Sequence, residues 1–256
     1  NVANDVNINE LLSMQFGLEW QHQREIRARS YNNYDLAQWA RRESPINYYS
    51  DIEHETIVGG EKSRDVSGIY AQWLYQLGAD TRLTVGLRHD RYQSLDTRTS
   101  PRFALVHQLN ARHTLKLFYS EAFRAPTFGE THLLNNPVLI GNPDLVSETV
   151  KSSEILWYGI WDQLTFGARI YHNQYENPVT AGFMGNTRTY VNGARQKNYG
   201  ISSRINWQVN AQWMFNIQAN SFHDLPDAYV READSLGSMG VNYQREHWNW
   251  NFSAIY

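Results

Sequence analysis

Apolar and polar residues alternate along most of this chain with a period of two. The clearest stretch is Leu12–Gln21, in which Leu, Met, Phe, Leu and Trp alternate with polar or small residues. This period places the two series on opposite faces of an extended strand, whereas a helix would bunch its apolar residues at spacings of three and four. The pattern therefore predicts a β-strand with one apolar and one polar face.

The same alternation recurs to the end of the chain and predicts an all-β fold of about eleven strands. Beyond the first strand, strands are expected at Val66–Leu77, Thr81–Asp90, Pro101–Leu109, Leu115–Ser120, Thr149–Gly159, Leu164–Asn173, Thr189–Val209, Gln212–Phe222, Ser235–Tyr243 and Trp248–Tyr256. The strand that begins at Leu115 breaks at Arg124-Ala-Pro126, since proline cannot donate to a strand ladder.

The connections between these strands alternate in length. Residues 23–64, 93–100, 124–147 and 223–232 form the longer connections, and one or two helical turns are expected at Asp35–Arg42. The intervening turns, such as 78–80 and 110–113, are short. An antiparallel meander with short turns on one side and long loops on the other is typical of an up-and-down transmembrane β-barrel.

The positions of the tryptophan residues agree with this arrangement of short turns and long loops. Seven of the nine Trp lie close to the short turns, namely Trp73, Trp157, Trp161, Trp207, Trp213, Trp248 and Trp250. Trp prefers the boundary between lipid and water, so this band predicts an aromatic girdle on the short-turn side. A soluble antiparallel sandwich or propeller is the alternative, because alternation and buried Trp occur there too. Polar residues at nearly every second position suit a hydrated lumen better than a soluble core.

Composition narrows the class of protein further. The 256 residues contain no apolar run near ~20 residues, so no transmembrane helix is expected. With 23 basic and 26 acidic residues and no Lys/Arg run, the chain has no basic field for nucleic acid. Cysteine is absent, which excludes disulfides, thiol nucleophiles and Cys-based metal sites.

Four stretches resemble a known family. SPRFALV at 100–106, LKLFYSEAFRAPTFGE at 115–130, GNPDLVSET at 141–149 and YVNGARQKNYGISSRINW at 190–207 are similar to the C-terminal barrel half of TonB-dependent outer-membrane receptors. The similarity covers most of residues 65–256, and Val146-Ser147 stands where the family commonly has Lys-Pro. The resemblance implies a barrel of about 22 strands in the Gram-negative outer membrane, surrounded by lipid and plugged by an N-terminal domain. It also implies import of a ferric siderophore, haem or cobalamin with energy from the inner-membrane TonB complex.

The resemblance extends only to the barrel part of these receptors. Eleven strands are too few for the whole barrel, and neither a plug domain nor a TonB-contacting segment is evident. We therefore expect residues 1–256 to be a partial barrel domain, with the plug outside this chain. The final Tyr256 resembles the terminal aromatic residue of outer-membrane proteins, although a cut within any lipid-facing strand would also leave one.

No enzyme constellation is present in the sequence. His54-Glu55 lacks the second His of a zinc-protease helix, and there is no GxSxG elbow, phosphate loop or dinucleotide-binding glycine pattern. The nine His are scattered without close pairs. We expect no catalytic residue, metal site or cofactor. An outer-membrane hydrolase with Ser and His on the barrel wall ranks third among the possible functions.

The predicted function is ligand capture by the long loops, followed by gated import without covalent chemistry. The candidate ligand contacts lie in the loop 23–64: Arg27, Arg29, Tyr31, Tyr34, Tyr48 and Tyr49. Arg presents a planar fork to anionic chelates, and Tyr offers rigid contact area at low entropic cost. A merely solvated loop is the alternative for these residues, and a passive, porin-like channel is the alternative for the protein.

A second group of residues suggests rim architecture rather than ligand binding. It comprises Arg124, Pro126, Asn142, Pro143 and Glu148. Pro126 ends a strand, Asn142-Pro143-Asp144 suits a turn in which side chains bond the nearby backbone, and Glu148 is expected to pair with a neighbouring Arg.

Overall fold

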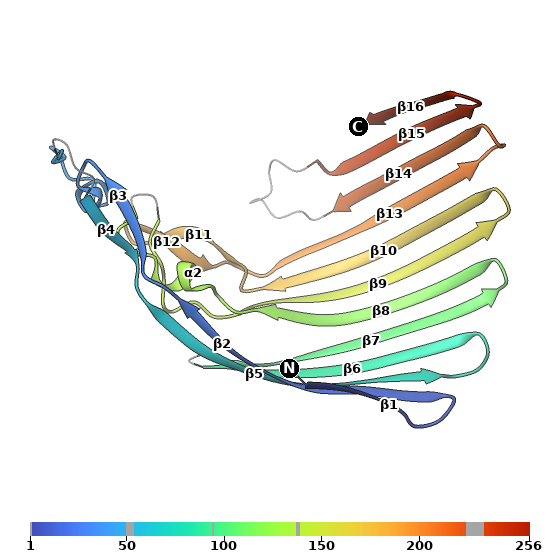
Figure 1. The fold of residues 1–256 in the computed structure, drawn as a ribbon, viewed down its shortest axis with the longest axis horizontal. Coiled ribbons are helices and arrows are strands. Elements are labelled where there is room, and N and C mark those ends of the chain that lie inside the picture. The colour runs from blue at the N-terminus through green and yellow to red at the C-terminus, as the bar shows by residue number, and fades with distance from the viewer. Residues whose placement is uncertain (1, 50–53, 94, 137–138, 224–232) are drawn as a thin grey trace.

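A single antiparallel sheet of twelve strands makes up most of the molecule (Figure 1). The computed structural model describes residues 2–256 apart from 50–53, 94, 137–138 and 224–232. In spatial order the strands are β1 (Val2–Asn7), β2 (Leu12–Glu25), β5 (Lys62–Gln76), β6 (Thr81–Tyr92), β7 (Thr97–Asn110), β8 (His113–Arg124), β9 (Glu148–Trp161), β10 (Leu164–Glu176), β13 (Gln196–Gln208), β14 (Trp213–His223), β15 (Ser235–Arg245) and β16 (Trp248–Ile255). Each strand pairs with the next one in this order, and β1 and β16 lie at the two edges of the described sheet, so the predicted all-β meander is confirmed.

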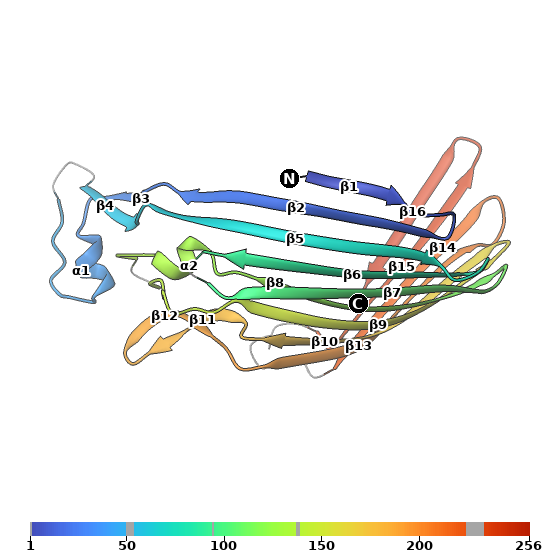
Figure 2. The same cartoon turned by 90° about the horizontal axis from the view of Figure 1, so that it is seen from below.

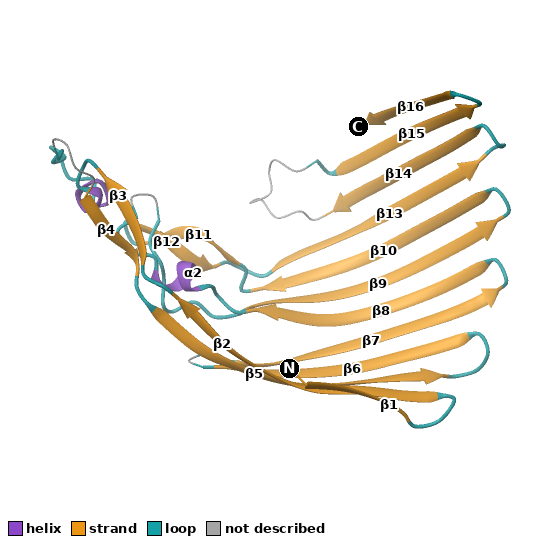
Figure 3. Ribbon diagram, viewed as in Figure 1, coloured by secondary structure: helices purple, strands orange, loops and turns teal. Residues whose placement is uncertain are grey.

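The sheet is bent into a trough with different connections at its two ends (Figures 1 and 2). Short turns join the strands at one end, for example residues 162–163 between β9 and β10. The long connections leave the other end and carry the remaining elements, including both helices (Figure 3). These elements are β3 (Ala28–Asn32), α1 (Leu36–Ala40), β4 (His54–Gly59), α2 (Phe128–His132), β11 (Val179–Met184) and β12 (Thr187–Asn192). No helix of the described residues is long and apolar enough to cross a membrane.

The two faces of the sheet differ in polarity, as the alternation predicts. One face presents large apolar side chains to the surroundings, and Leu18, Ile69 and Ile201 on it are more than half exposed. Cross-strand register aligns them in rows, such as Leu18 beside Ile69. Rows of exposed apolar side chains would be a severe liability in water and are stable against lipid.

The Trp band lies where the sequence predicts it. The rings contact one another near the short turns: Trp157 and Trp161 meet edge to face at 6.4 Å, and the Trp213 ring lies 4.6 Å from that of Tyr243. His113, at the start of β8, stacks on Trp157 at 5.4 Å. This cluster forms an aromatic girdle along the short-turn end.

Three predictions about strands were wrong. The main sheet has twelve strands rather than eleven, because Val2–Asn7 pairs with β2 although Asn4 interrupts its apolar series. The expected long strand Thr189–Val209 is two strands, β12 and β13, separated by Gly193-Ala-Arg195. β7 begins at Thr97 instead of Pro101, so the connection 93–100 shortens to residues 93–96.

The loop 23–64 was predicted too long and too irregular, whereas the connection 124–147 has nearly the predicted bounds. β2 runs on to Glu25 and β5 begins at Lys62, and the segment between them contains the β3–β4 hairpin. The predicted helical turns at Asp35–Arg42 are confirmed as α1. The strand that was expected to end at Arg124 does so, and α2 follows it. The loop predicted at 223–232 lies, but for His223, outside the described residues.

Candidate functional site

The segment between β2 and β5 projects beyond the end of the sheet (Figure 2). We call its described residues, 26–49 and 54–61, the β3–β4 extension. Arg29 and Tyr31 lie on one face of β3 and meet Glu55 of β4. Arg29 Nη1 donates to Glu55 Oε2 at 2.9 Å, and the Tyr31 hydroxyl donates to the same oxygen at 3.3 Å. Two of the predicted contact residues therefore share one carboxylate.

The other predicted residues form a second group at the tip. Tyr34 and Tyr48 make an antiparallel β-bridge, and their rings lie 6.3 Å apart. Trp39 of α1 meets the Tyr34 ring edge to face at 5.8 Å. Tyr48 is 72% exposed, so its ring is available to a ligand. The backbone N–H of Tyr49 donates to Asn33 O at 2.7 Å.

Arg27 stands apart from both groups. It is exposed at the base of the extension and makes no hydrogen bond or ion pair with any residue that the structure describes. Arg27, which interacts with Glu61 through its charge alone, and the hydrogen-bonded Arg29–Glu55 pair thus present different electrostatics to an incoming anion.

Arg124 ties three segments of the rim together. Its Nε donates to Glu148 Oε1 at 2.5 Å, and its two terminal nitrogens donate to Glu130 at 2.8 and 3.0 Å. Glu148 Oε2 accepts the backbone N–H of Val179, at the start of β11, at 3.0 Å. One guanidinium therefore links the end of β8, α2, the start of β9 and, through Glu148, β11.

Glu130 also caps the helix in which it lies. The Thr127 hydroxyl accepts the Glu130 N–H at 3.1 Å, and the Thr127 N–H donates to Glu130 Oε2 at 2.8 Å, which is a capping box. Burial opposes ionisation of Glu130, but the hydrogen bonds from Arg124 and Thr127 outweigh it and hold the pKa of this carboxyl below its usual value.

Asn142 and Pro126 complete this rim network. Asn142 is buried; its Nδ2 donates to Tyr190 O at 2.9 Å, and its Oδ1 accepts the Asp144 N–H at 3.0 Å. Pro126 is fully buried, and its carbonyl accepts Arg64 Nη1 at 2.7 Å. Pro143, between Asn142 and Asp144, is exposed. The architectural role of this group stays a prediction, and these contacts are its physical basis.

The rim network holds the β3–β4 extension directly. Leu133 forms a β-bridge with Gly59, the Leu134 N–H donates to Val58 O at 2.7 Å, and Asn135 Nδ2 donates to Ile57 O at 2.9 Å. The residues just after α2 therefore support β4, which carries Glu55.

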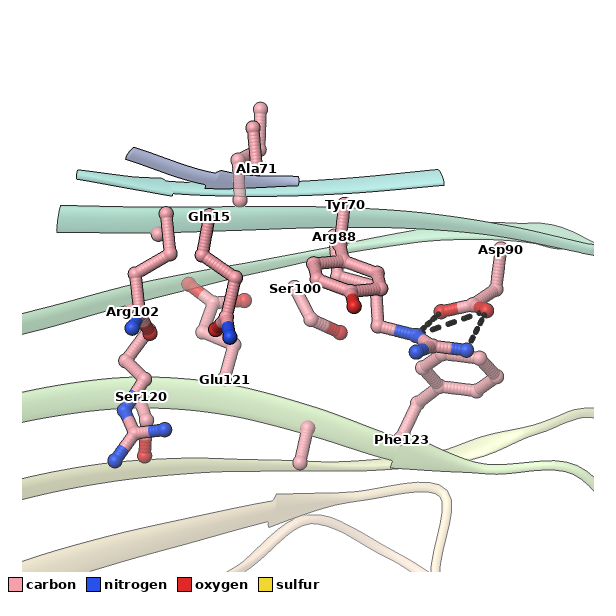
Figure 4. A pocket seen from close by; sticks show the side chains of 14 residues that line it. Gln15, Tyr70, Ala71, Arg88, Asp90, Ser100, Arg102, Ser120, Glu121 and Phe123 are labelled. Atoms are coloured by element: carbon pink, nitrogen blue, oxygen red, sulfur yellow. Dashed lines mark hydrogen bonds and ion pairs between the residues drawn. The ribbon is translucent and has the colours of Figure 1, made fainter. Parts of the chain in front are cut away.

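The concave wall of the trough is polar (Figure 4). A recess of about 550 Å³ is lined by Gln15, Tyr70, Arg88 and Arg102, among others. Arg88 is neutralised there, because it donates to Asp90 at 2.7–3.0 Å and to Glu19 at 2.8 Å. Among the described residues, no group of three or more His, Asp or Glu side chains could hold a metal ion.

Sequence reasoning missed two residues that organise these sites. Glu55 was considered only as part of an incomplete zinc motif, whereas a hairpin alignment of 28–32 with 54–59 would have placed it opposite Tyr31. Glu130 was overlooked, although Thr127-Phe-Gly-Glu130 matches the capping-box spacing that marks a helix start.

A lipid-facing apolar side, a polar concave side, an aromatic girdle and short turns at one end define the wall of a transmembrane β-barrel. The chain belongs to the TonB-dependent receptors: residues 3–256 match the family model described as "TonB dependent receptor-like, beta-barrel". This family comprises transporters and not enzymes, and it lies in the outer membrane of Gram-negative bacteria.

Three relatives of this chain each align with it over only part of their own length. The ferric enterobactin receptor of Pseudomonas aeruginosa is 28% identical over 137 aligned residues, covering 47% of this chain and 18% of that receptor. The solved siderophore receptor PirA from Pseudomonas aeruginosa superposes with a TM-score of 0.74 at 17% identity, covering 99% of this chain and 44% of that one. The FrpB iron transporter from Neisseria meningitidis gives 0.68 at 14% identity, covering 98% and 41%. The chain spans less than half the length of each of these relatives.

Proposed function

We propose that the protein binds an iron chelate of the siderophore class at the outer surface and imports it with energy from the inner-membrane TonB complex. In this proposal residues 1–256 are part of the barrel domain, and the intact receptor also has a plug domain. The names of the relatives support the ligand class. The observation that carries the proposal is the β3–β4 extension, which projects past the barrel wall and bears Arg and Tyr side chains.

The two groups of the extension suit different parts of such a ligand. Arg27 supplies an unpaired cation for carboxylate or phenolate oxygens. The Tyr34–Trp39–Tyr48 cluster supplies a rigid aromatic surface for the organic part of the chelate. Arg29 is held by Glu55, which also accepts a hydrogen bond from Tyr31, so Arg29 contributes a fixed hydrogen-bonding surface rather than a free charge.

The test is alanine replacement at Arg27, Arg29, Tyr48 and Tyr49, one at a time, in the complete receptor. We expect Arg27→Ala and Tyr48→Ala each to weaken binding of a ferric tris-catecholate chelate by about tenfold, which corresponds to about 1.4 kcal/mol. Arg41→Ala is the matched control, because Arg41 lies in the same extension but is paired with Glu43 at 2.6 Å. Insertion into the outer membrane should be unchanged throughout. Unchanged binding and uptake in all four variants would remove the extension as the capture site.

A further inference from the structure

A second recess in the concave wall is basic and takes no part in the proposed capture site. It encloses about 580 Å³ across β8, β9, β10, β13 and β14. Lys116, Arg169 and Arg204 line it together with Tyr158 and Asn206, and no carboxylate is among the described residues that line it. All three cations lie nearer to the short turns than to the long connections; Arg204, for example, is four residues from the end of β13.

The strand register brings the three cations together on one face. Lys116 on β8 and Arg169 on β10 both pair with Leu156 of β9, so their Cα atoms are about 10 Å apart. Arg169 also pairs with Ser202, two residues before Arg204, so these two arginines are diagonal neighbours at about 7–8 Å. Such like charges repel one another unless a counter-charge lies between them.

Among the described residues, one carboxylate near the recess, that of Glu154, supplies part of that counter-charge. Arg169 Nη1 reaches Glu154 at 3.4 Å, and its guanidinium lies 4.7 Å over the Tyr171 ring, but its Nε–H is buried with no acceptor among the described residues. Lys116 and Arg204 make no hydrogen bond or ion pair with any residue the structure describes. The recess in Figure 4 differs, because Asp90 and Glu19 neutralise Arg88 there.

We propose that the basic recess binds a small polyanion, namely the carboxylate- or phenolate-rich chelate on its way through the lumen. This inference rests on the proposed function and adds a second ligand-binding site in the lumen, below the capture loops. Two guanidiniums offer planar forks for bidentate anion binding, and Lys116 adds a point charge. The volume is in the range of small-ligand pockets.

Calorimetric titration of the complete receptor with citrate tests the recess without requiring transport. The Lys116→Gln/Arg204→Gln double variant should bind citrate at least about tenfold more weakly than the wild type, because two charge-assisted contacts are lost. Arg204→Lys keeps the charge but loses the planar fork, so it should weaken citrate binding by only about threefold. The double control Arg91→Gln/Arg112→Gln removes two exposed cations outside the recess and should leave citrate binding unchanged. Uncharged trimethyl citrate should not distinguish the variants.

Uptake of a radiolabelled ferric tris-catecholate chelate provides the second measurement. The Lys116→Gln/Arg204→Gln variant should bind the chelate at the surface within about twofold of the wild type but import it about tenfold more slowly. Citrate binding that is absent, or insensitive to Lys116 and Arg204, overturns the recess proposal whatever the uptake shows. Loss of folded stability in the double variant also overturns it, since the cations would then hold a protein segment. A wild type that binds citrate at the recess but imports no iron chelate would overturn the proposed function alone.

Discussion

Replacement of Arg124 by methionine tests the rim network. The Arg124 side chain donates three hydrogen bonds to two carboxylates, Glu130 and Glu148. A hydrogen bond to a charged partner contributes about 1.5–3 kcal/mol. Because 41% of the Arg124 side chain is exposed, solvent screening reduces the sum, and we expect a loss of about 2 kcal/mol. Methionine preserves the aliphatic length, so this loss reports on the guanidinium.

Native-state hydrogen exchange on the complete receptor measures that loss locally. Three backbone amides report on the network: Thr131 donates to Thr127 O, Gly141 to Leu133 O, and Asn142 to Glu130 O. A loss of 2 kcal/mol in local opening free energy corresponds to exchange about 30-fold faster at these amides. Arg124→Lys retains the charge but not the planar fork, so we expect an acceleration of only about fivefold.

Two outcomes would contradict this reasoning. Exchange that accelerates less than about threefold in Arg124→Met would show that the carboxylates find other partners. Loss of ligand binding with unchanged exchange would show that Arg124 contacts the ligand instead. Arg112→Met is the control, because Arg112 lies in the exposed turn between β7 and β8, far along the strands from the rim.

Two further predictions concern the same segment. In Gly141→Ala, the added Cβ would lie 2.4 Å from Leu133 N and 2.5 Å from His132 N. Because the backbone must shift to relieve this clash, the Asn142 amide should exchange at least about tenfold faster. Gly60→Ala is the control, because its added Cβ would meet nothing within 4 Å. The folded pKa of Glu130 lies below its unfolded value of about 4.3, so its stabilisation is present above that pH and is lost as the pH falls through the folded pKa. Protection of the Thr131 amide, corrected for intrinsic rates, should therefore decline below about pH 4 more steeply in the wild type than in Glu130→Gln, which keeps only the Arg124–Glu148 pair. A pH-independent wild type would contradict the ion-pair account.

The membrane-spanning strands could be predicted because lipid contacts one face of each strand and the aqueous lumen contacts the other. Lipid selects an apolar residue at one position and the aqueous lumen a polar residue at the next, which imprints the period of two on strands such as Leu164–Glu176. The Trp girdle follows from the same boundary. Prediction failed for β1, because Asn4 interrupts its apolar series, and for β11–β12, because this hairpin lies outside the main sheet, where the two solvents do not enforce the alternation.

The candidate sites were less accessible to sequence reasoning because their members come together through tertiary contacts. The choice of the Arg and Tyr residues around 23–64 followed from residue type, but type alone does not reveal that Glu55 neutralises Arg29 while Arg27 stays unpaired. Likewise, Lys116, Arg169 and Arg204 each occupy an ordinary lumen-facing position. Only the register of β8, β9, β10 and β13 shows that these three residues are neighbours on one face of the sheet.

Apart from their own hairpins, the long connections are joined to one another by isolated β-bridges and by side chains that bond to the backbone, rather than by a continuous ladder of paired strands. Asn135 reaches Ile57, Asn142 reaches Tyr190, and Asn192 bonds both Val146 and Asn177. Each bond joins segments that are distant in sequence, and each leaves a backbone group unsatisfied if it breaks. The β3–β4 extension therefore shares its support with the loop after α2. Since β4 carries Glu55, any movement of residues 133–135 must shift the surface that we propose meets the ligand first.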